Sequence, residues 1–173
     1  KVKGWEILEN NVIHSIGKYQ NRTYIFTQKN GVYILENGVL NSWKSPLNEI
    51  LKTAYINAAL FIKNNKLIIG TASKGLFVFD LNNSSFTNIN KNNVLMNNSI
   101  LSIGQDKENN LWLGLDNGIA HIEVNSPISI FYDNSGVLGS VYSVATTEKG
   151  YLMASNHGVF KYEENQFSLV PNT

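Results

Sequence analysis

A fourfold internal repeat limits the possible folds of this chain more than any other feature of its sequence. A glycine that opens a short apolar stretch recurs at intervals of 44, 43 and 40 residues, at Gly31, Gly75, Gly118 and Gly158. Two further strand-like segments precede each glycine, as Ile100–Ile103 and Leu111–Gly114 do in the third repeat. This period is typical of proteins that stack one supersecondary unit many times, because a single unit cannot bury its apolar surface alone.

Each repeat is expected to hold four short strands joined by tight turns. Asn-Asn and Asn-Gly steps lie between the strand-like segments, and such residues supply the positive φ that tight turns need. An aromatic residue is expected to open the fourth strand of each repeat, at Trp43, Phe86, Phe131 and Phe167. Trp5 is interpreted as part of the last strand of a preceding blade. Helical periodicity is confined to Leu47–Tyr55, where we expect one or two turns of helix.

The fold class that follows is all-β, built from four-stranded antiparallel β-propeller blades of about 40–44 residues. Residues 1–173 are expected to form a single propeller segment. Its parts are the end of a preceding blade (1–12) and four repeat units (13–55, 56–99, 100–140 and 141–173). Because most propellers need more than four blades of this size to close, we expect the segment to be part of a larger propeller.

The composition excludes several classes of function. Fourteen basic and thirteen acidic residues leave a net charge of +1, so there is no excess of cations for binding nucleic acid or an acidic membrane. Wholly apolar runs reach only four to five residues, as at Ala58–Ile62, which is too short to cross a bilayer. The chain has no cysteine, which rules out disulfides, zinc–thiolate sites and thiol nucleophiles.

The third repeat carries a recognisable motif. Its residues Asn110–Gly114, followed by Asn117–Ile119, resemble the two-component regulator propeller repeat, whose consensus is roughly N-x-L-W-x-G-T-x-x-G-[LI]. The upstream I-x-S-[IV] strand of that family is matched by Ile13–Ile16, Ile100–Ile103 and Val141–Val144. The departures are Ile25, Ile68 and Leu152 for the tryptophan, Thr27 and Ala154 for the first glycine, and Leu115 for the threonine.

The resemblance implies a periplasmic or otherwise extracytoplasmic sensor. In that family the propeller repeats precede an immunoglobulin-like domain, a membrane helix and a histidine kinase or DNA-binding output. Many members are associated with breakdown products of polysaccharides. The partners implied are an oligosaccharide ligand, the remaining blades or a following immunoglobulin-like domain, and a second copy in a full-length homodimer. Nucleic acid and direct membrane contact are not implied.

No catalytic, cofactor or metal site is expected. The three histidines, His14, His121 and His157, share no metal-ligand spacing. Carboxylates are scattered over different turns, so no pair can be assigned as acid and base. We therefore expect a protein that is not an enzyme. A carbohydrate-active enzyme would need carboxylates clustered on one face.

The candidate ligand-binding residues lie in the turns after the second strand of each repeat. They are Lys29, Asn30, Lys74, Asp116, Asn117, Asn156 and His157. In propellers these turns crowd one face, together with the segments before the first strands, of which Ser45–Tyr55 and Asn88–Ser99 are the longest here. Their amide, ammonium and carboxylate groups could hydrogen-bond the hydroxyls of a sugar. They could equally be ordinary turn residues.

The resemblance implies two alternative functions. The first is a ligand-sensing propeller segment of a bacterial two-component regulator that responds to a carbohydrate. The alternative is a scaffold or binding module of a surface or secretion-associated protein that gives no signal. The blade sequence favours neither over the other.

Overall fold

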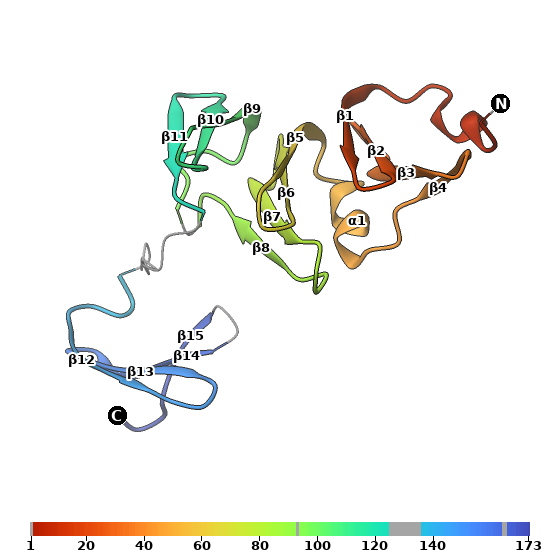
Figure 1. Cartoon of the computed structure of the whole chain (residues 1–173). Helices are drawn as coiled ribbons and strands as arrows, with labels where there is room; N and C mark the ends of the chain where they lie inside the picture. The colour runs from red at the N-terminus through yellow and green to blue at the C-terminus, as the bar shows by residue number, and fades with distance from the viewer. Residues whose placement is uncertain (1, 93, 125–135, 164–165) are drawn as a thin grey trace. The chain divides into compact units, whose positions relative to one another are not determined.

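The computed structural model of the chain describes residues 2–92, 94–124, 136–163 and 166–173. The chain forms two compact units, Lys1–Ser129 and Ile130–Thr173. Figure 1 shows the elements of both. The division into four repeat units within a single propeller stays a prediction.

Three antiparallel sheets make up the first unit, and in each the strands pair in chain order. The first sheet holds β1 (Ile13–Tyr19), β2 (Arg22–Thr27), β3 (Val32–Glu36) and β4 (Val39–Ser42). The second holds β5 (Ile56–Ile62), β6 (Lys66–Thr71), β7 (Leu76–Asp80) and β8 (Phe86–Ile89). The third holds β9 (Ile100–Gln105), β10 (Leu111–Leu115) and β11 (Ile119–Ile122). Phe131, predicted to open its fourth strand, lies outside the described residues.

The second unit holds one four-stranded antiparallel sheet. Its strands are β12 (Val141–Thr146), β13 (Gly150–Ser155), β14 (Gly158–Glu163) and β15 (Gln166–Leu169). The predicted all-β class with four-stranded antiparallel blades is therefore confirmed. Within the described residues, no helix is both long and apolar enough to cross a membrane.

All four sheets repeat the same irregularity where the first strand begins. The pairing of the first and second strands shifts by one residue at His14, Asn57, Leu101 and Tyr142. Next to each bulge, the residue that follows the second strand donates its N–H to the carbonyl just before the first strand. These bonds are Gln28 to Val12, Ala72 to Tyr55, Asp116 to Ser99 and Asn156 to Ser140. The repeat is thus preserved in the backbone hydrogen bonds.

The strand pairing corrects the predicted alignment of the first repeat by one residue. Phe26 lies opposite the residue after the bulge, which is the place Gly114 takes in the third sheet. Tyr24, and not Ile25, is therefore the structural equivalent of Trp112. The threonine that follows Phe26 then matches the threonine of the consensus. The turn after this strand is one residue longer in the first two repeats than in the third, and the first repeat lacks the Gly70-Thr71 pair that marks the end of the strand in the second.

Two tryptophans differ from their predicted places. Trp5 begins a turn of 3-10 helix, η1 (Trp5–Leu8), and does not complete a strand. The turn allows Leu8 to pack on the first sheet, where it is buried. Trp43 follows β4 and does not open it. Its ring leaves the strand to pack edge-on against Phe79 of the second sheet, with 4.8 Å between ring centroids.

The predicted short helix is confirmed as α1 (Pro46–Leu51). Ser45 caps it by accepting a hydrogen bond from the N–H of Leu47, and proline occupies the first turn, where its missing N–H costs nothing. Leu47 and Leu51 are fully buried in the cluster formed by the first two sheets. The insertion between these sheets is therefore part of the core.

Candidate functional site

In each sheet of the first unit, a turn follows the second strand and a segment precedes the first strand. These turns and segments lie on one surface. We call this the loop-end surface and define it as residues 28–31, 53–55, 72–75, 98–99 and 116–118. The recurring backbone bonds hold each turn to the segment that precedes its own sheet. Two more bonds run to the next sheet, from the N–H of Ile56 to the carbonyl of Gln28 and from Gly75 to Asn98. The turns are therefore fixed to one another through the intervening segments.

Buried threonines shape the first two turns. The hydroxyl of Thr27 donates to the carbonyl of Gly31 at 2.7 Å and accepts from the N–H of Asn30 at 3.1 Å. The same two bonds recur around Thr71, which accepts from the N–H of Lys74 at 3.0 Å. With the backbone held in this way, the side chains of Asn30 and Lys74 are exposed. The side chain of Asn30 donates to that of Asn11.

The segment 53–55 lies between the turns of two repeats and contacts both. On one side, Nζ of Lys29 lies 5.7 Å from the centroid of the Tyr55 ring, within the range of a cation–π contact. On the other, Nζ of Lys74 donates to Oγ1 of Thr53 at 3.2 Å, and the hydroxyl of Ser73 donates to the carbonyl of Ala54 at 3.2 Å. Tyr55 itself is 42% exposed. One ammonium group thus lies beside an exposed aromatic ring, and a second one is bonded to the residue two positions earlier.

The backbone of Tyr55 has a φ of 58°, in the left-handed region that a bulky residue rarely adopts. Such conformations persist only where surrounding contacts impose them, and they cluster at functional sites. Here the carbonyl of Tyr55 accepts from Ala72, and the N–H of the next residue is bonded to the first turn. These two bonds hold the ring at the surface.

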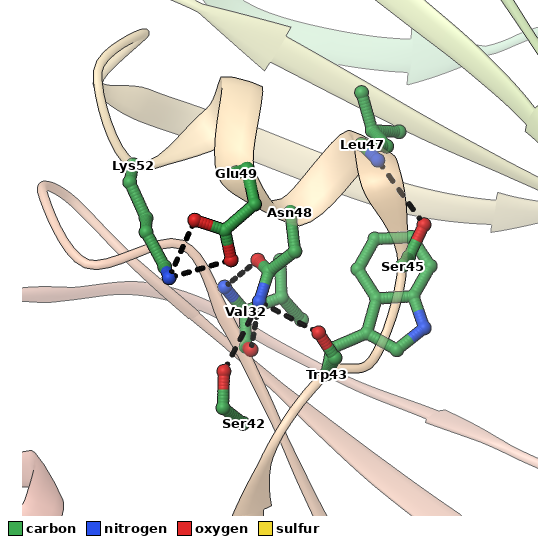
Figure 2. A network of polar contacts seen from close by, with 8 residues as sticks. All are labelled: Val32, Ser42, Trp43, Ser45, Leu47, Asn48, Glu49 and Lys52. Atoms are coloured by element: carbon green, nitrogen blue, oxygen red, sulfur yellow. Dashed lines mark hydrogen bonds and ion pairs between the residues drawn. The ribbon is translucent and has the colours of Figure 1, made fainter.

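Asn48 anchors the helix that carries this segment (Figure 2). Its side chain is fully buried, and Oδ1 accepts from the N–H of Val32 at 2.7 Å. Nδ2 donates to the carbonyls of Trp43 at 2.9 Å and Val32 at 3.2 Å, and to the hydroxyl of Ser42 at 3.3 Å. A Cβ on Gly31 would lie 2.4 Å from Oδ1, so only glycine fits beside this amide. Asn48 therefore ties α1 to the turn that bears Lys29 and Asn30.

The other predicted candidates belong to the turns of the third and fourth sheets. Asp116 and Asn117 are exposed in the turn of the third sheet. Asn156 and His157 belong to the second unit, where Oδ1 of Asn156 accepts from the N–H of Ser140 at 2.7 Å. Nδ1 of His157 lies 3.0 Å from the carbonyl oxygen of Val137. These last two side chains organise their own turn. The ligand-binding role of all seven candidates stays a prediction.

The sequence interpretation missed Tyr55, Thr53 and Asn48. A signal for Tyr55 was present, because the equivalent positions hold Val12, Ser99 and Ser140, so an aromatic residue there breaks the repeat. Nothing in the sequence distinguishes Asn48 from the many other asparagines of the chain. Its role depends on burial, which the sequence of a six-residue helix does not reveal.

A second polar cluster lies on the third sheet. Oδ2 of Asp106 accepts from Nε1 of Trp112 at 3.2 Å, and Nε2 of His121 lies 3.5 Å from the same oxygen. Burial raises the pKa of Asp106, but the hydrogen bonds from Asn110, Trp112 and His121 outweigh it and leave this pKa below its ordinary value. Trp112 is 47% exposed, so the cluster is open to solvent.

Replacing Asp106 by asparagine is expected to destabilise the first unit more at pH 7 than at pH 3. A carboxyl whose pKa is lowered by folding stabilises the fold above its ordinary pKa of 3.8, and this contribution is lost as the pH falls through the folded value. Urea midpoints of both proteins at the two pH values measure the effect. Glu108→Gln, in the same turn, serves as the control. An equal shift at both pH values would contradict the role of the charge.

None of the described residues form a group of three or more His, Asp or Glu side chains suited to a metal ion. The site consists of an exposed ring, two ammonium groups and several amides, which can bind a ligand through stacking and hydrogen bonds.

Comparison with known proteins gives a family match for one repeat. The family model of the two component regulator propeller matches residues 94–117, which contain the motif around Trp112. The resemblance predicted from that motif is confirmed. No match to a curated protein sequence was found.

Solved structures share the fold at low sequence identity. One is the extracellular domain of BT3049 from B. thetaiotaomicron, assigned to a hybrid two component system, with 18% identity and a TM-score of 0.55 over 93% of this chain and 22% of that one. Another is PorZ, a surface component of the type-IX secretion system of Porphyromonas gingivalis, with 16% identity and a TM-score of 0.58 over 82% of this chain and 21% of that one. The chain thus spans about a fifth of the length of these proteins.

Proposed function

We propose that this chain, which carries a two component regulator propeller repeat, is part of the extracytoplasmic sensing region of a two-component regulator and binds a carbohydrate signal without catalysing a reaction. The observation that carries the proposal is the exposed ring of Tyr55, held at positive φ between the turns of two repeats. The likeness to BT3049, an extracellular domain, supports the location.

The residues at the loop-end surface suit a sugar. The face of a tyrosine ring packs against the C–H groups of a pyranose, and amide and ammonium groups hydrogen-bond its hydroxyls. Lys29 contacts the ring of Tyr55, Lys74 contacts Thr53 two residues earlier, and Asn30 is exposed in the same turn as Lys29. Asp116 and Asn117 extend the polar surface along the third turn.

Binding would change the signal by favouring one arrangement of the regulator over another. A ligand shifts a conformational equilibrium only by the difference in its affinity for the two states. We propose that the ligand contacts the loop-end surface more tightly in one packing of propeller and following domain, and that this packing sets the geometry of a dimeric output. The immunoglobulin-like domain and the homodimer belong to this proposal.

Thermal unfolding of the full-length protein with a panel of neutral and acidic oligosaccharides tests binding. A ligand at 100 times its Kd stabilises the folded state by about 2.7 kcal/mol, so one member of the panel should raise the melting temperature by several degrees. Tyr55→Ala should abolish this shift. Tyr151→Ala, which removes a ring of similar exposure (39%) from β13, should retain it. Failure of every saccharide to stabilise the protein would overturn the proposal.

The alternative is a scaffold module of a surface or secretion apparatus, which the likeness to PorZ favours. The two proposals differ in what a chromosomal deletion does. Loss of a saccharide-induced transcriptional response supports the sensor. Loss of surface or secreted proteins without any change in transcription supports the scaffold.

A further inference from the structure

We infer that the ligand of the loop-end surface is an anionic saccharide, bound through its carboxylate or sulfate group by Lys29, which contacts the ring of Tyr55, and Lys74, which contacts Thr53. The inference rests on the proposed function and specifies the class of sugar.

The two ammonium groups come from different repeats and approach the same three residues. Lys29 reaches the ring of Tyr55, and Lys74 reaches the hydroxyl of Thr53, two residues before it. Both lysines are exposed at their turns. Because segment 53–55 is bonded to both turns, the backbone positions from which the two lysines extend are fixed relative to each other.

Among the described residues, neither ammonium group forms an ion pair. In the part of the chain that the structure describes, the ion pairs join Arg22 to Glu36, Lys52 to Glu49, Lys161 to Glu163 and His121 to Asp106. Lys29 and Lys74 are in none of them. The bordering segments 28–31, 50–55 and 72–75 contain no Asp or Glu. Glu49, just before them, is already paired with Lys52 at 2.7 Å.

An uncompensated cationic pair beside an exposed ring matches an acidic sugar better than a neutral one. The ring contacts the apolar face of the sugar, while two ammonium groups that lack carboxylate partners attract its anionic substituent. In a neutral sugar the same lysines would be only hydrogen-bond donors. The electrostatic part of the affinity should fall as salt rises, because exposed charges are screened.

Titration of the full-length protein with matched pairs of ligands tests the inference. One pair is an oligogalacturonate and its methyl ester, in which a neutral ester replaces each carboxylate. The other pair is a carrageenan oligosaccharide and its desulfated form. We expect one acidic ligand to bind and its uncharged counterpart to bind at least about tenfold more weakly. Which acidic ligand binds distinguishes a carboxylate from a sulfate.

Substitution of the lysines tests whether Lys29 and Lys74 bind the anionic group of the ligand. Lys29→Gln and Lys74→Gln should each weaken the acidic ligand about two- to fivefold, the range for one exposed ion pair, and the double variant should weaken it by more than either. Lys63→Gln is the matched control, since Lys63 is an exposed lysine in the turn between β5 and β6, at the other end of the second sheet. Raising the salt to about 0.5 M should reduce the difference between the parent protein and the double variant.

The outcomes separate the inference from the proposed function. If a neutral sugar binds as tightly as its acidic counterpart and the lysine variants leave its Kd unchanged, the inference is wrong and the proposed function stands. If no saccharide of either kind binds, both are wrong. If an acidic ligand binds but Lys63→Gln weakens it as much as the two turn variants, the assignment to Lys29 and Lys74 is wrong.

Discussion

Asn48→Ala is expected to lower the free energy of unfolding of the first unit by about 3 kcal/mol or more. The substitution removes the acceptor of the Val32 N–H at 2.7 Å and the donor to the Trp43 carbonyl at 2.9 Å. Val32 is fully buried, so water cannot replace the lost partner. Each buried polar group left without a partner costs about 1–3 kcal/mol. Urea unfolding, followed by tryptophan fluorescence, measures the loss.

Asn41→Ala is the matched control for this substitution. Asn41 lies on β4 of the same sheet, but its side chain is exposed, and we expect a change within about 0.5 kcal/mol. Asn48→Asp provides a second comparison, because it keeps the acceptor, loses the donor and buries a charge. It should be more destabilising at pH 7 than at pH 3, where the carboxyl is protonated. Equal stability of Asn48→Ala and Asn41→Ala would show that the buried amide does not anchor α1.

The second large effect is expected for Gly75→Ala, at about 3 kcal/mol or more. Gly75 has a φ of 78°, and a Cβ there would lie 2.3 Å from the carbonyl oxygen of Ile89 and 2.9 Å from Cβ of Asn90. The first of these atoms belongs to the backbone, which cannot move aside as a flexible side chain would. The turn that carries Lys74 must therefore shift, or the end of β8 must separate from it.

Gly38→Ala is the control, because the difference between the two variants gives the steric part of the destabilisation. Gly38 has nearly the same φ, 77°, but a Cβ added there would have no atom within 4 Å. Only the backbone penalty of about 1–2 kcal/mol is therefore expected. Both glycines belong to the first unit, so the two unfolding transitions can be compared directly. If the two variants lose the same stability, the clash with Ile89 is relieved at no cost and the prediction is wrong.

The architecture could be predicted from the sequence because it recurs. Strand positions, tight turns and the glycine after the second turn appear in every repeat, and each occurrence supports the others. The prediction failed in the first repeat, where the longer turn is not accompanied by the Gly-Thr pair that marks the end of the second strand in the second repeat. The alignment there was displaced by one residue, so that Ile25 was placed where Tyr24 lies. Trp43 was misplaced because its packing against Phe79 of the next sheet has no counterpart in the local sequence pattern.

The candidate site was only partly predictable, for the same reason. The turns that hold Lys29, Asn30 and Lys74 follow from the repeat, since every blade has a turn there. The ring between them belongs to a segment that no other repeat shares, and its contacts reach Lys29, 26 residues earlier, and Ala72, 17 residues later. Contacts of this kind depend on how neighbouring sheets stack, which a comparison of repeats cannot give.

The order of residues along the chain is enough to specify four-stranded antiparallel sheets, one after another, with turns of known composition at one end. Strand and turn formation are local, and their periodicity is written in consecutive residues. Which turn residues meet is settled by packing between sheets. The packing of neighbouring sheets buries the Asn48 amide and brings segment 53–55 into contact with Lys29 and Lys74. These partners are distant in sequence, and the energetic cost of leaving a buried polar group unpaired selects one arrangement of them.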